Sequence, residues 1–335
     1  MSDDRLIDDP KLRKLEALIR KSFRVRDNRT PVYVDVAGHL DRIGLDQHQI
    51  VFGRRGSGKS CLLIYFRREV ASKHKVHSIY ILGDTIKTLE YPDVLIRLLL
   101  AIFDGLPGPG PYKRVWLTLR RSKSERKAVV HELRALLALP SESKLRVTTG
   151  ASESKSSGSS VGVNKTVEAS LTEESAETSS REEIRESHDR KIRTVDARLS
   201  DYKRVIQDEM ERSSREYGVF IIDDFYLIDP ADQPDVIDYL HRLLRDTDLY
   251  LKVGTVQHRT QLLRTSPIHV GVQVGQDVDG FSLDQTLEDI EQTGAYLEEM
   301  LRKLGEQVDV HDAPALMSDQ GRKDIILLAG GVPRD

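Results

Sequence analysis

The sequence predicts an α/β fold in which helices sandwich a parallel β-sheet. Strand-like runs alternate with helical stretches along the chain, which is the order of connected β-α-β units. A glycine-rich loop joins one strand-like run, residues 49–52, to an apolar helical stretch. A second run, residues 219–222, is entirely apolar and is typical of a strand buried on both faces. At roughly 150 residues per domain, the 335 residues correspond to about two domains.

The composition excludes several classes of protein. Hydrophobic residues make up 39% of the chain and charged residues 31%, so it can form a core and remain soluble. The net charge of −3 argues against a polycationic nucleic-acid binder. A single cysteine excludes a disulfide framework and a thiolate zinc cluster. No apolar run approaches the ~20 residues of a membrane span, and the acidic N-terminal segment is unlike a secretory signal, so we expect a cytoplasmic protein.

The first 140 residues alternate between helical and strand-like stretches. Residues 10–23 are typical of an amphipathic helix because their leucines recur on one face at helical spacing. Prolines and glycines between 105 and 111 predict a loop. The other elements expected in this region are strands at 32–36, 49–52 and 77–82 and helices at 61–70, 92–103 and 112–139.

An insertion follows Pro140. Residues 141–180 are mostly small and polar, and two interpretations remain open: a disordered segment, or a small β-arm in which apolar residues at period two flank a Ser-Gly turn. Residues 181–217 predict a long helix with a coiled-coil-like seam. We favour a helix that covers the sheet over an arm for partner binding or self-association. The seam consists of Ile192, Val195, Leu199, Tyr202 and Ile206.

The α/β pattern resumes after the insertion. We expect strands at 219–222, 249–253 and 270–274 and helices at 234–245 and 283–304. The chain then divides into an N-terminal helix or arm at 1–30, a core in two parts at 31–140 and 218–282, the insertion and long helix at 141–217, and the start of a helical lid at 283–335.

The glycine-rich loop has the spacing of a phosphate-binding loop, G-x-x-x-x-G-K-[ST]. The matching residues are Gly53, Arg54, Arg55, Gly56, Ser57, Gly58, Lys59 and Ser60. Glycines let backbone N–H groups face a β-phosphate, and the following helix adds the positive end of its dipole. Lys59 is predicted to reach the β- and γ-phosphates, and the Ser60 hydroxyl to bind Mg²⁺. Cys61 completes the nucleotide-binding stretch and begins the apolar face of the helix, and the two arginines make the mouth of the site positive.

Two acids at the end of the apolar run 219–222 complete the predicted site. Ligands bind at the carboxyl ends of the strands in open α/β sheets, and both acids follow such a strand. Asp223 is predicted to hold Mg²⁺, and Asp224 to orient or deprotonate the attacking water.

These motifs resemble those of AAA+ ATPases, a class of P-loop NTPases, and most closely their initiator-type (origin-recognition-like) and STAND-type branch. The motifs GRRGSGKS, FIIDD, LKVGT and GGVPRD occur in the same order, over about residues 30–104 and 217–335. The resemblance implies ATP and Mg²⁺ as cofactors. It also implies a sheet in which the strands of Asp223 and Leu249 flank the strand of the glycine-rich loop, and it leads us to expect a lid helix and a further domain after the last motif.

The resemblance also assigns roles to three more residues. Thr255 matches a polar sensor that reads the γ-phosphate or the water, and Arg334 matches an arginine at the start of the lid. An arginine that acts on a neighbouring subunit is expected within 257–264, near the end of the helix before the last strand, where Arg264 is favoured over Arg259. Such an arrangement implies a homo-oligomer.

The primary functional hypothesis is Mg²⁺-dependent hydrolysis of ATP, coupled to assembly or to remodelling of a partner. The family usually ends its metal strand in Asp-Glu, whereas Asp223 is followed by the shorter Asp224, which is typical of slow turnover. The alternative is therefore a slowly hydrolysing, STAND-like nucleotide switch that binds a protein partner through 141–217, or that is associated with DNA or a defence system. DNA binding has one further indication, the basic residues Arg114, Arg120, Arg121, Lys123, Arg126 and Lys127 of one predicted helix.

Overall fold

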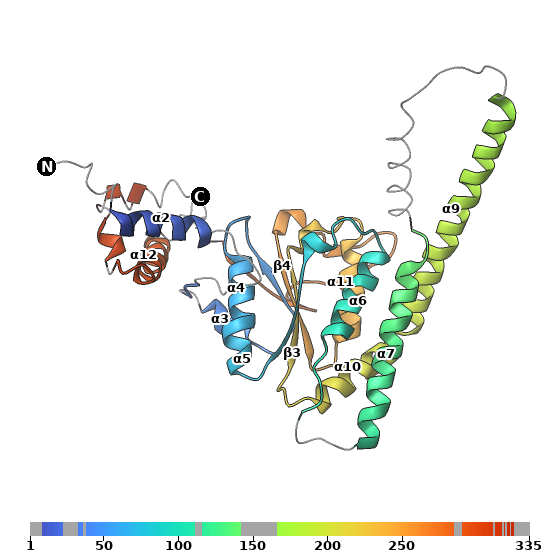
Figure 1. Cartoon of the computed structure of the whole chain (residues 1–335), viewed down its shortest axis with the longest axis horizontal. Coiled ribbons are helices and arrows are strands. Elements are labelled where there is room, and N and C mark those ends of the chain that lie inside the picture. Colours follow the sequence, from blue (N-terminus) through green and yellow to red (C-terminus); the bar gives the residue numbers. More distant parts are fainter. Residues whose placement is uncertain are drawn as a thin grey trace.

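The computed structural model describes residues 9–22, 33–35, 38–110, 116–141, 166–284, 290–310, 312–316, 318, 320–321 and 323–324. Its strands are β1 (Gln49–Phe52), β2 (His77–Leu82), β3 (Gly218–Asp223), β4 (Leu249–Thr255), β5 (Leu263–Arg264), β6 (Val270–Gly271) and β7 (Asp279–Ser282). Five of them form a parallel sheet in the order β2-β3-β4-β1-β7, and β5 and β6 form a separate antiparallel pair. The parallel α/β sheet expected from the sequence is therefore present (Figure 1).

The position of β4 differs from the arrangement that the family resemblance implied. β1 pairs with β4 on one side and with β7 on the other, so β3 lies one strand further from β1. In register, Phe52 at the end of β1 pairs with Thr255 at the end of β4. β4 is almost entirely buried, which suits an inner strand between two neighbours. The expectation that the strand of Asp223 flanks the strand of the glycine-rich loop is therefore wrong.

Two of the expected strands lie elsewhere or have no regular structure. In the run at 270–274 only β6 is a strand, and it pairs with β5 outside the sheet. Gly271 interrupts this run, so no continuous apolar stretch is left for a buried strand. The fifth strand of the sheet is instead β7. Of the expected strand at 32–36, residues 33–35 have no regular secondary structure, and its other residues lie outside the described ones.

Helices cover both faces of the sheet (Figure 1). One face carries α6 (Asp93–Gly105), α7 (Trp116–Ala138), α10 (Leu199–Arg212) and α11 (Gln233–Leu244). The other carries α3 (His39–Ile43), α4 (Lys59–Tyr65), the π-helical segment η1 (Phe66–Val70) and α5 (Ala71–Lys73). Alternate residues of β3 explain this division, because Phe220 and Ile222 pack into the first core and Val219 and Ile221 into the second.

The long helix of the insertion packs against the core. α9 (Thr166–Ala197) is followed by α10 after a break at Arg198. Residues 166–180 are therefore helical, which contradicts both the disordered segment and the β-arm over that range, while residues 142–165 lie outside the described part. Val195, Tyr202 and Ile206 of the seam are buried in the same core as α6 and α11. This stretch covers the sheet, whereas the first part of α9 extends beyond it in Figure 1.

A buried ion pair fastens α9 to the core, and its loss is expected to be costly. Lys191 Nζ lies 2.7 Å from Asp93 Oδ1, and both side chains are almost fully buried. Lys191→Met leaves the Asp93 carboxylate buried without a counter-charge, so the free energy of unfolding should fall by about 3–5 kcal/mol. Urea denaturation checks this, with Lys203→Met as the control, because Lys203 pairs with the exposed Asp246 and should contribute under about 1 kcal/mol. Equal effects of the two substitutions would contradict the prediction.

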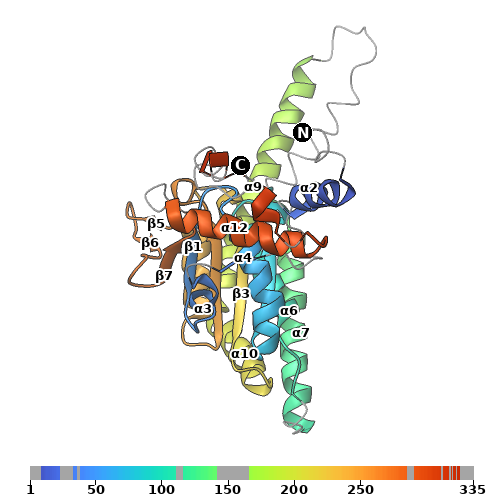
Figure 2. The same ribbon diagram turned by 90° about the vertical axis from the view of Figure 1, so that its left-hand side faces the viewer.

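A small helical cluster lies on the α4 side of the sheet, as Figures 1 and 2 both show. It consists of α2 (Pro10–Ser22), α12 (Ile290–Glu306) and the 3₁₀-helix η6 (Ala313–Leu316), which meet around Leu15, Leu304 and Ala313. Lys303 of α12 donates a hydrogen bond of 3.1 Å to the carbonyl oxygen of Tyr33, which ties the cluster to the segment before α3. Among the helices of the described residues, none combines the length and the apolar character needed to cross a bilayer.

Candidate functional site

The glycine-rich loop connects the end of β1 to the start of α4. Gly56 and Gly58 have φ of 95° and 96°, a backbone conformation that residues other than glycine rarely adopt. These two glycines therefore let the chain turn from strand into helix. The helical segment then runs on through η1 to Lys73. As at any helix N-terminus, the first N–H groups of α4 have no acceptor within the helix. The loop therefore presents donors and a positive dipole end, which suit an anion.

Lys59 places its ammonium group inside this loop. Its side chain is buried, and Nζ donates hydrogen bonds to the carbonyl oxygens of Gly53 (2.7 Å) and Arg54 (2.8 Å). Burial lowers the pKa of Lys59, while the charges of Asp224, Asp223 and Asp284 oppose this shift. The structure thus brings the predicted lysine close to both predicted acids.

Asp223 ends β3 and is fully buried. Its Oδ1 accepts the backbone N–H of Asp224 at 3.0 Å, and its Oδ2 accepts the Tyr80 hydroxyl at 2.8 Å. The Ser60 hydroxyl also hydrogen-bonds to this carboxylate. Burial, and then the charge of Asp224, raise the pKa of Asp223 to about 6. The two residues predicted to bind a metal, Ser60 and Asp223, therefore meet.

Gly254 explains how Asp223 reaches the loop although β4 lies between β3 and β1. A Cβ atom at position 254 would lie 3.1 Å from Asp223 Oδ1 and 2.7 Å from Cδ1 of Leu63 in α4. Because Gly254 has no side chain, nothing stands between the Asp223 carboxylate and the first turn of α4 at this point. The sequence contains this glycine within the motif LKVGT, but its role depends on the order of the strands.

Asp224 lies next to Asp223 in a left-handed backbone conformation, with φ of 57°. Its side chain is half-buried, and burial raises its pKa while Lys59 and Arg55 lower it. Beside it, the Arg259 guanidinium lies 5.6 Å from the centre of the Tyr226 ring. Arg55 and Arg259 both act electrostatically on Tyr226, so the mouth of the site carries two cations as well as the acids.

Of the three remaining predicted residues, Thr255 lies at the expected strand end, Arg264 lies elsewhere than expected, and Arg334 is not among the described residues. Thr255 ends β4 beside Phe52 and is buried, and its hydroxyl shares a 2.5 Å hydrogen bond with the Thr260 hydroxyl. Arg264 lies in β5, not at a helix end, because residues 257–264 form the short 3₁₀-helix η4 (Gln257–Arg259) and then a strand. Its guanidinium makes two 3.0 Å hydrogen bonds to Asp235 of its own chain. Arg334 lies outside the described residues.

Sequence reasoning missed two residues that touch the site, Tyr80 and Asp284. Asp284 Oδ1 accepts the backbone N–H of Arg54 at 2.6 Å and lies 3.5 Å from its Nε. Asp284 follows β7, a strand that the sequence pattern did not reveal, and Tyr80 faces Asp223 only through the pairing of β2 with β3. Cys61 is half-buried, and burial raises the pKa of its thiol to about 12, in keeping with its predicted place on the apolar face.

The pKa of Asp223 predicts how this residue affects stability. Its folded-state pKa of about 6 lies above the ordinary value of 3.8, so the folded state binds more protons between these values. The free energy of unfolding therefore falls as pH rises through this range. Between pH 4 and pH 7, without added nucleotide or metal, the free energy of unfolding of the wild type should fall by about 2 kcal/mol relative to that of Asp223→Asn. Urea denaturation at both pH values, with the exposed Asp189→Asn as control, checks this; the same change with pH in the wild type and in Asp223→Asn would contradict it.

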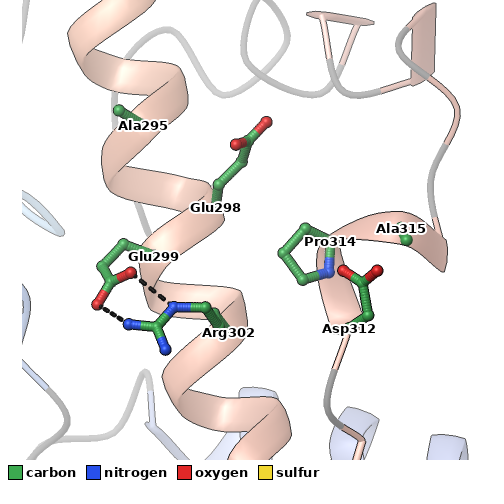
Figure 3. A pocket seen from close by; sticks show the side chains of 7 residues that line it. All are labelled: Ala295, Glu298, Glu299, Arg302, Asp312, Pro314 and Ala315. Atoms are coloured by element: carbon green, nitrogen blue, oxygen red, sulfur yellow. Dashed lines mark hydrogen bonds and ion pairs between the residues drawn. The ribbon is translucent and has the colours of Figure 1, made fainter.

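Two open cavities among the described residues lie away from this site. One, of ≈ 440 Å³, lies between the outer parts of α12 and η6, and Figure 3 shows its acidic lining, in which Glu299 pairs with Arg302. The other, of ≈ 570 Å³, lies between the end of α6 and α7. Neither is lined by a residue of the glycine-rich loop.

Metal ligation at the site would rest on few protein groups. In the described part of the chain, no group of three or more His, Cys, Asp or Glu side chains is placed to hold a metal ion. The protein oxygens offered by Ser60 and Asp223 are of the kind that Mg²⁺ prefers, and Mg²⁺ usually keeps several waters and substrate phosphates as its other ligands. No protein-family model matches the chain, and no curated protein matches its sequence.

Proposed function

We propose that the chain is a Mg²⁺-dependent ATPase of the AAA+ type, within the initiator-type and STAND-type branch of the P-loop NTPases. The observation that carries this proposal is the meeting of Lys59 and Ser60, from the start of α4, with Asp223 from the end of β3. A lysine in a glycine-rich loop, a hydroxyl and a carboxylate are the groups that bind a triphosphate and its magnesium ion. The strand–loop–helix context supports the same function.

The residues present fit a nucleotide phosphate. The Ser57 Oγ atom in the loop is buried and has no hydrogen-bond partner among the described residues, so the wall of the site keeps an unused polar atom. In the proposed complex, Lys59 exchanges its bonds to the Gly53 and Arg54 carbonyls for bonds to the β- and γ-phosphates. Ser60 and Asp223 would hold Mg²⁺, which would supply positive charge to offset the negative charge of the phosphates.

Asp224 is the proposed acceptor for the proton of the attacking water. Burial raises its pKa, which makes its carboxylate a stronger base than an exposed one. Thr255 lies at the end of the neighbouring strand, and we assign its hydroxyl to orienting the water or the γ-phosphate. Arg55 and Arg259 supply positive charge at the mouth, where negative charge develops on the phosphate oxygens during transfer.

A slowly hydrolysing nucleotide switch is the second candidate function. It is favoured by Arg264, because the arginine assigned to a neighbouring subunit is held by Asp235 of its own chain. In this function, ATP holds an assembled homo-oligomer, and α9 offers a surface to a protein partner. Of the six basic residues that indicated DNA binding, Arg126 lends no support, because its guanidinium donates to the carbonyl oxygens of Phe103, Asp104 and Leu106 and thereby caps α6, and Arg114 lies outside the described residues.

The experiment that tests the proposal measures ATP binding and phosphate release by the full chain at several protein concentrations. We expect ATP binding that strengthens with Mg²⁺. Turnover that rises with protein concentration would favour the ATPase, since a neighbouring subunit then completes the site. Slow turnover with a nucleotide-dependent change in mass would favour the switch. Failure to bind ATP with or without Mg²⁺ would overturn both.

A further inference from the structure

The hydroxyl of Tyr80 lies against the carboxylate that is proposed to hold the metal. Tyr80 belongs to β2, and β2 pairs with β3 so that Tyr80 lies beside Ile221 and Leu82 beside Asp223. From this position the phenol reaches along β3 toward the end of the strand. It donates a hydrogen bond of 2.8 Å to Asp223 Oδ2.

Asp223 is held from several sides at once. Oδ1 accepts the N–H of Asp224, Oδ2 accepts the Tyr80 hydroxyl, and Ser60 also hydrogen-bonds to the group. The residue is fully buried, so protein donors must replace the water that an exposed carboxylate would have. Ser60 belongs to the proposed metal site itself. Tyr80 is therefore the side chain outside that site that fixes how the carboxylate is turned.

Tyr80 is in turn placed by the helix that follows the glycine-rich loop. The Arg67 guanidinium, in the π-helical segment η1, lies 5.2 Å from the centre of the Tyr80 ring. The ring also packs against the core between the sheet and α4. A tyrosine held in this way can keep its hydroxyl at one point, which is what a residue that orients a metal ligand needs.

We propose that Tyr80 is a positioning residue, whose hydroxyl holds the Asp223 carboxylate toward Ser60 so that a magnesium–nucleotide complex meets it already oriented. The inference rests on the proposed function and deepens it, because it names a residue on which the metal dependence of nucleotide binding relies. Removing a side chain that orients a metal ligand typically lowers metal affinity by about 10- to 100-fold.

The test is Tyr80→Phe in the full chain, with ATP affinity measured in EDTA and across a magnesium titration. We expect ATP affinity in EDTA to stay within about twofold of the wild type, because Lys59 and the loop are untouched. The magnesium concentration at which ATP binding is strengthened by half of its maximal amount should rise about tenfold. Tyr217→Phe is the matched control: it removes a phenol hydrogen bond to the carbonyl oxygen of Gly44, away from Asp223, and should leave both values unchanged.

A second variant separates orientation from a general loss of structure. If Tyr80 acts through Asp223, adding Tyr80→Phe to the Asp223→Asn variant should change magnesium dependence no further. A further tenfold loss in that background, or a single Tyr80→Phe variant with the wild-type magnesium dependence, would overturn the proposal. Failure of the function itself has a different signature, since the wild-type chain would then bind no ATP in either EDTA or magnesium.

Discussion

Lys59→Ala is expected to raise the dissociation constant for ATP by at least about 100-fold. The substitution removes an ammonium group whose three N–H donors can make at least two charge-assisted hydrogen bonds to phosphate. Each such bond is worth about 1.5–3 kcal/mol. Two such bonds correspond to a loss of 100-fold or more, at 1.4 kcal/mol per factor of ten. Burial strengthens the effect, because water cannot easily replace a side chain that is only 5% exposed. Isothermal titration of ATP into each variant measures it.

Lys59 also has a structural role that this experiment must separate from binding. Its ammonium group holds the carbonyl oxygens of Gly53 and Arg54, so the alanine variant loses bonds within the loop as well. Thermal melting without nucleotide reports that loss. Lys73→Ala is the matched control, because Lys73 pairs with Glu69 on the surface at the far end of the helical segment and should not change ATP affinity. Wild-type affinity in Lys59→Ala would remove the basis of the proposed function.

The sequence predicts those parts of the site that depend on neighbouring residues along the chain. The turn from β1 into α4 follows from Gly56, Gly58 and the apolar stretches on either side. Asp223 lies where the apolar run of β3 ends, and the end of a parallel strand is the ligand edge of such a sheet. Both features are local, so a pattern of residue types identifies them without knowledge of the fold.

The parts that the sequence misses depend on pairing between distant segments. β7 has the sequence Asp-Gly-Phe-Ser, with one large apolar side chain, and it is the edge strand beside β1 in the sheet that the described residues form. Without β7, neither the place of β1 in the sheet nor the contact of Asp284 with Arg54 can be inferred. Position in the chain likewise suggested Arg264 as a free arginine, whereas Asp235, which binds it, lies on α11. Such contacts are set by tertiary packing, and the spacing of residues along the sequence does not reveal them.

Asp224→Asn is expected to bind ATP with nearly wild-type affinity and to lower kcat by about 100-fold or more. The amide cannot accept a proton from water, and loss of a positioned general base typically costs 10²–10⁴ in rate. Asparagine is a close replacement at this position, because Asp224 has φ of 57° and asparagine, like aspartate, tolerates the left-handed region. The backbone N–H that holds Asp223 Oδ1 is kept. Phosphate release at saturating ATP and Mg²⁺ gives kcat.

The comparison with Asp223→Asn makes this prediction specific to Asp224. In the proposed function, Asp223 binds the metal and Asp224 accepts the proton of the attacking water. Asp223→Asn should therefore weaken the effect of Mg²⁺ on ATP binding. Asp224→Asn should leave that effect intact and lose only turnover. Asp229→Asn is the control in the same loop, since its carboxylate accepts the N–H of Ala231 and lies outside the site, and it should change neither property. Full turnover by Asp224→Asn would refute the role of this acid and leave the attacking water without its proposed base.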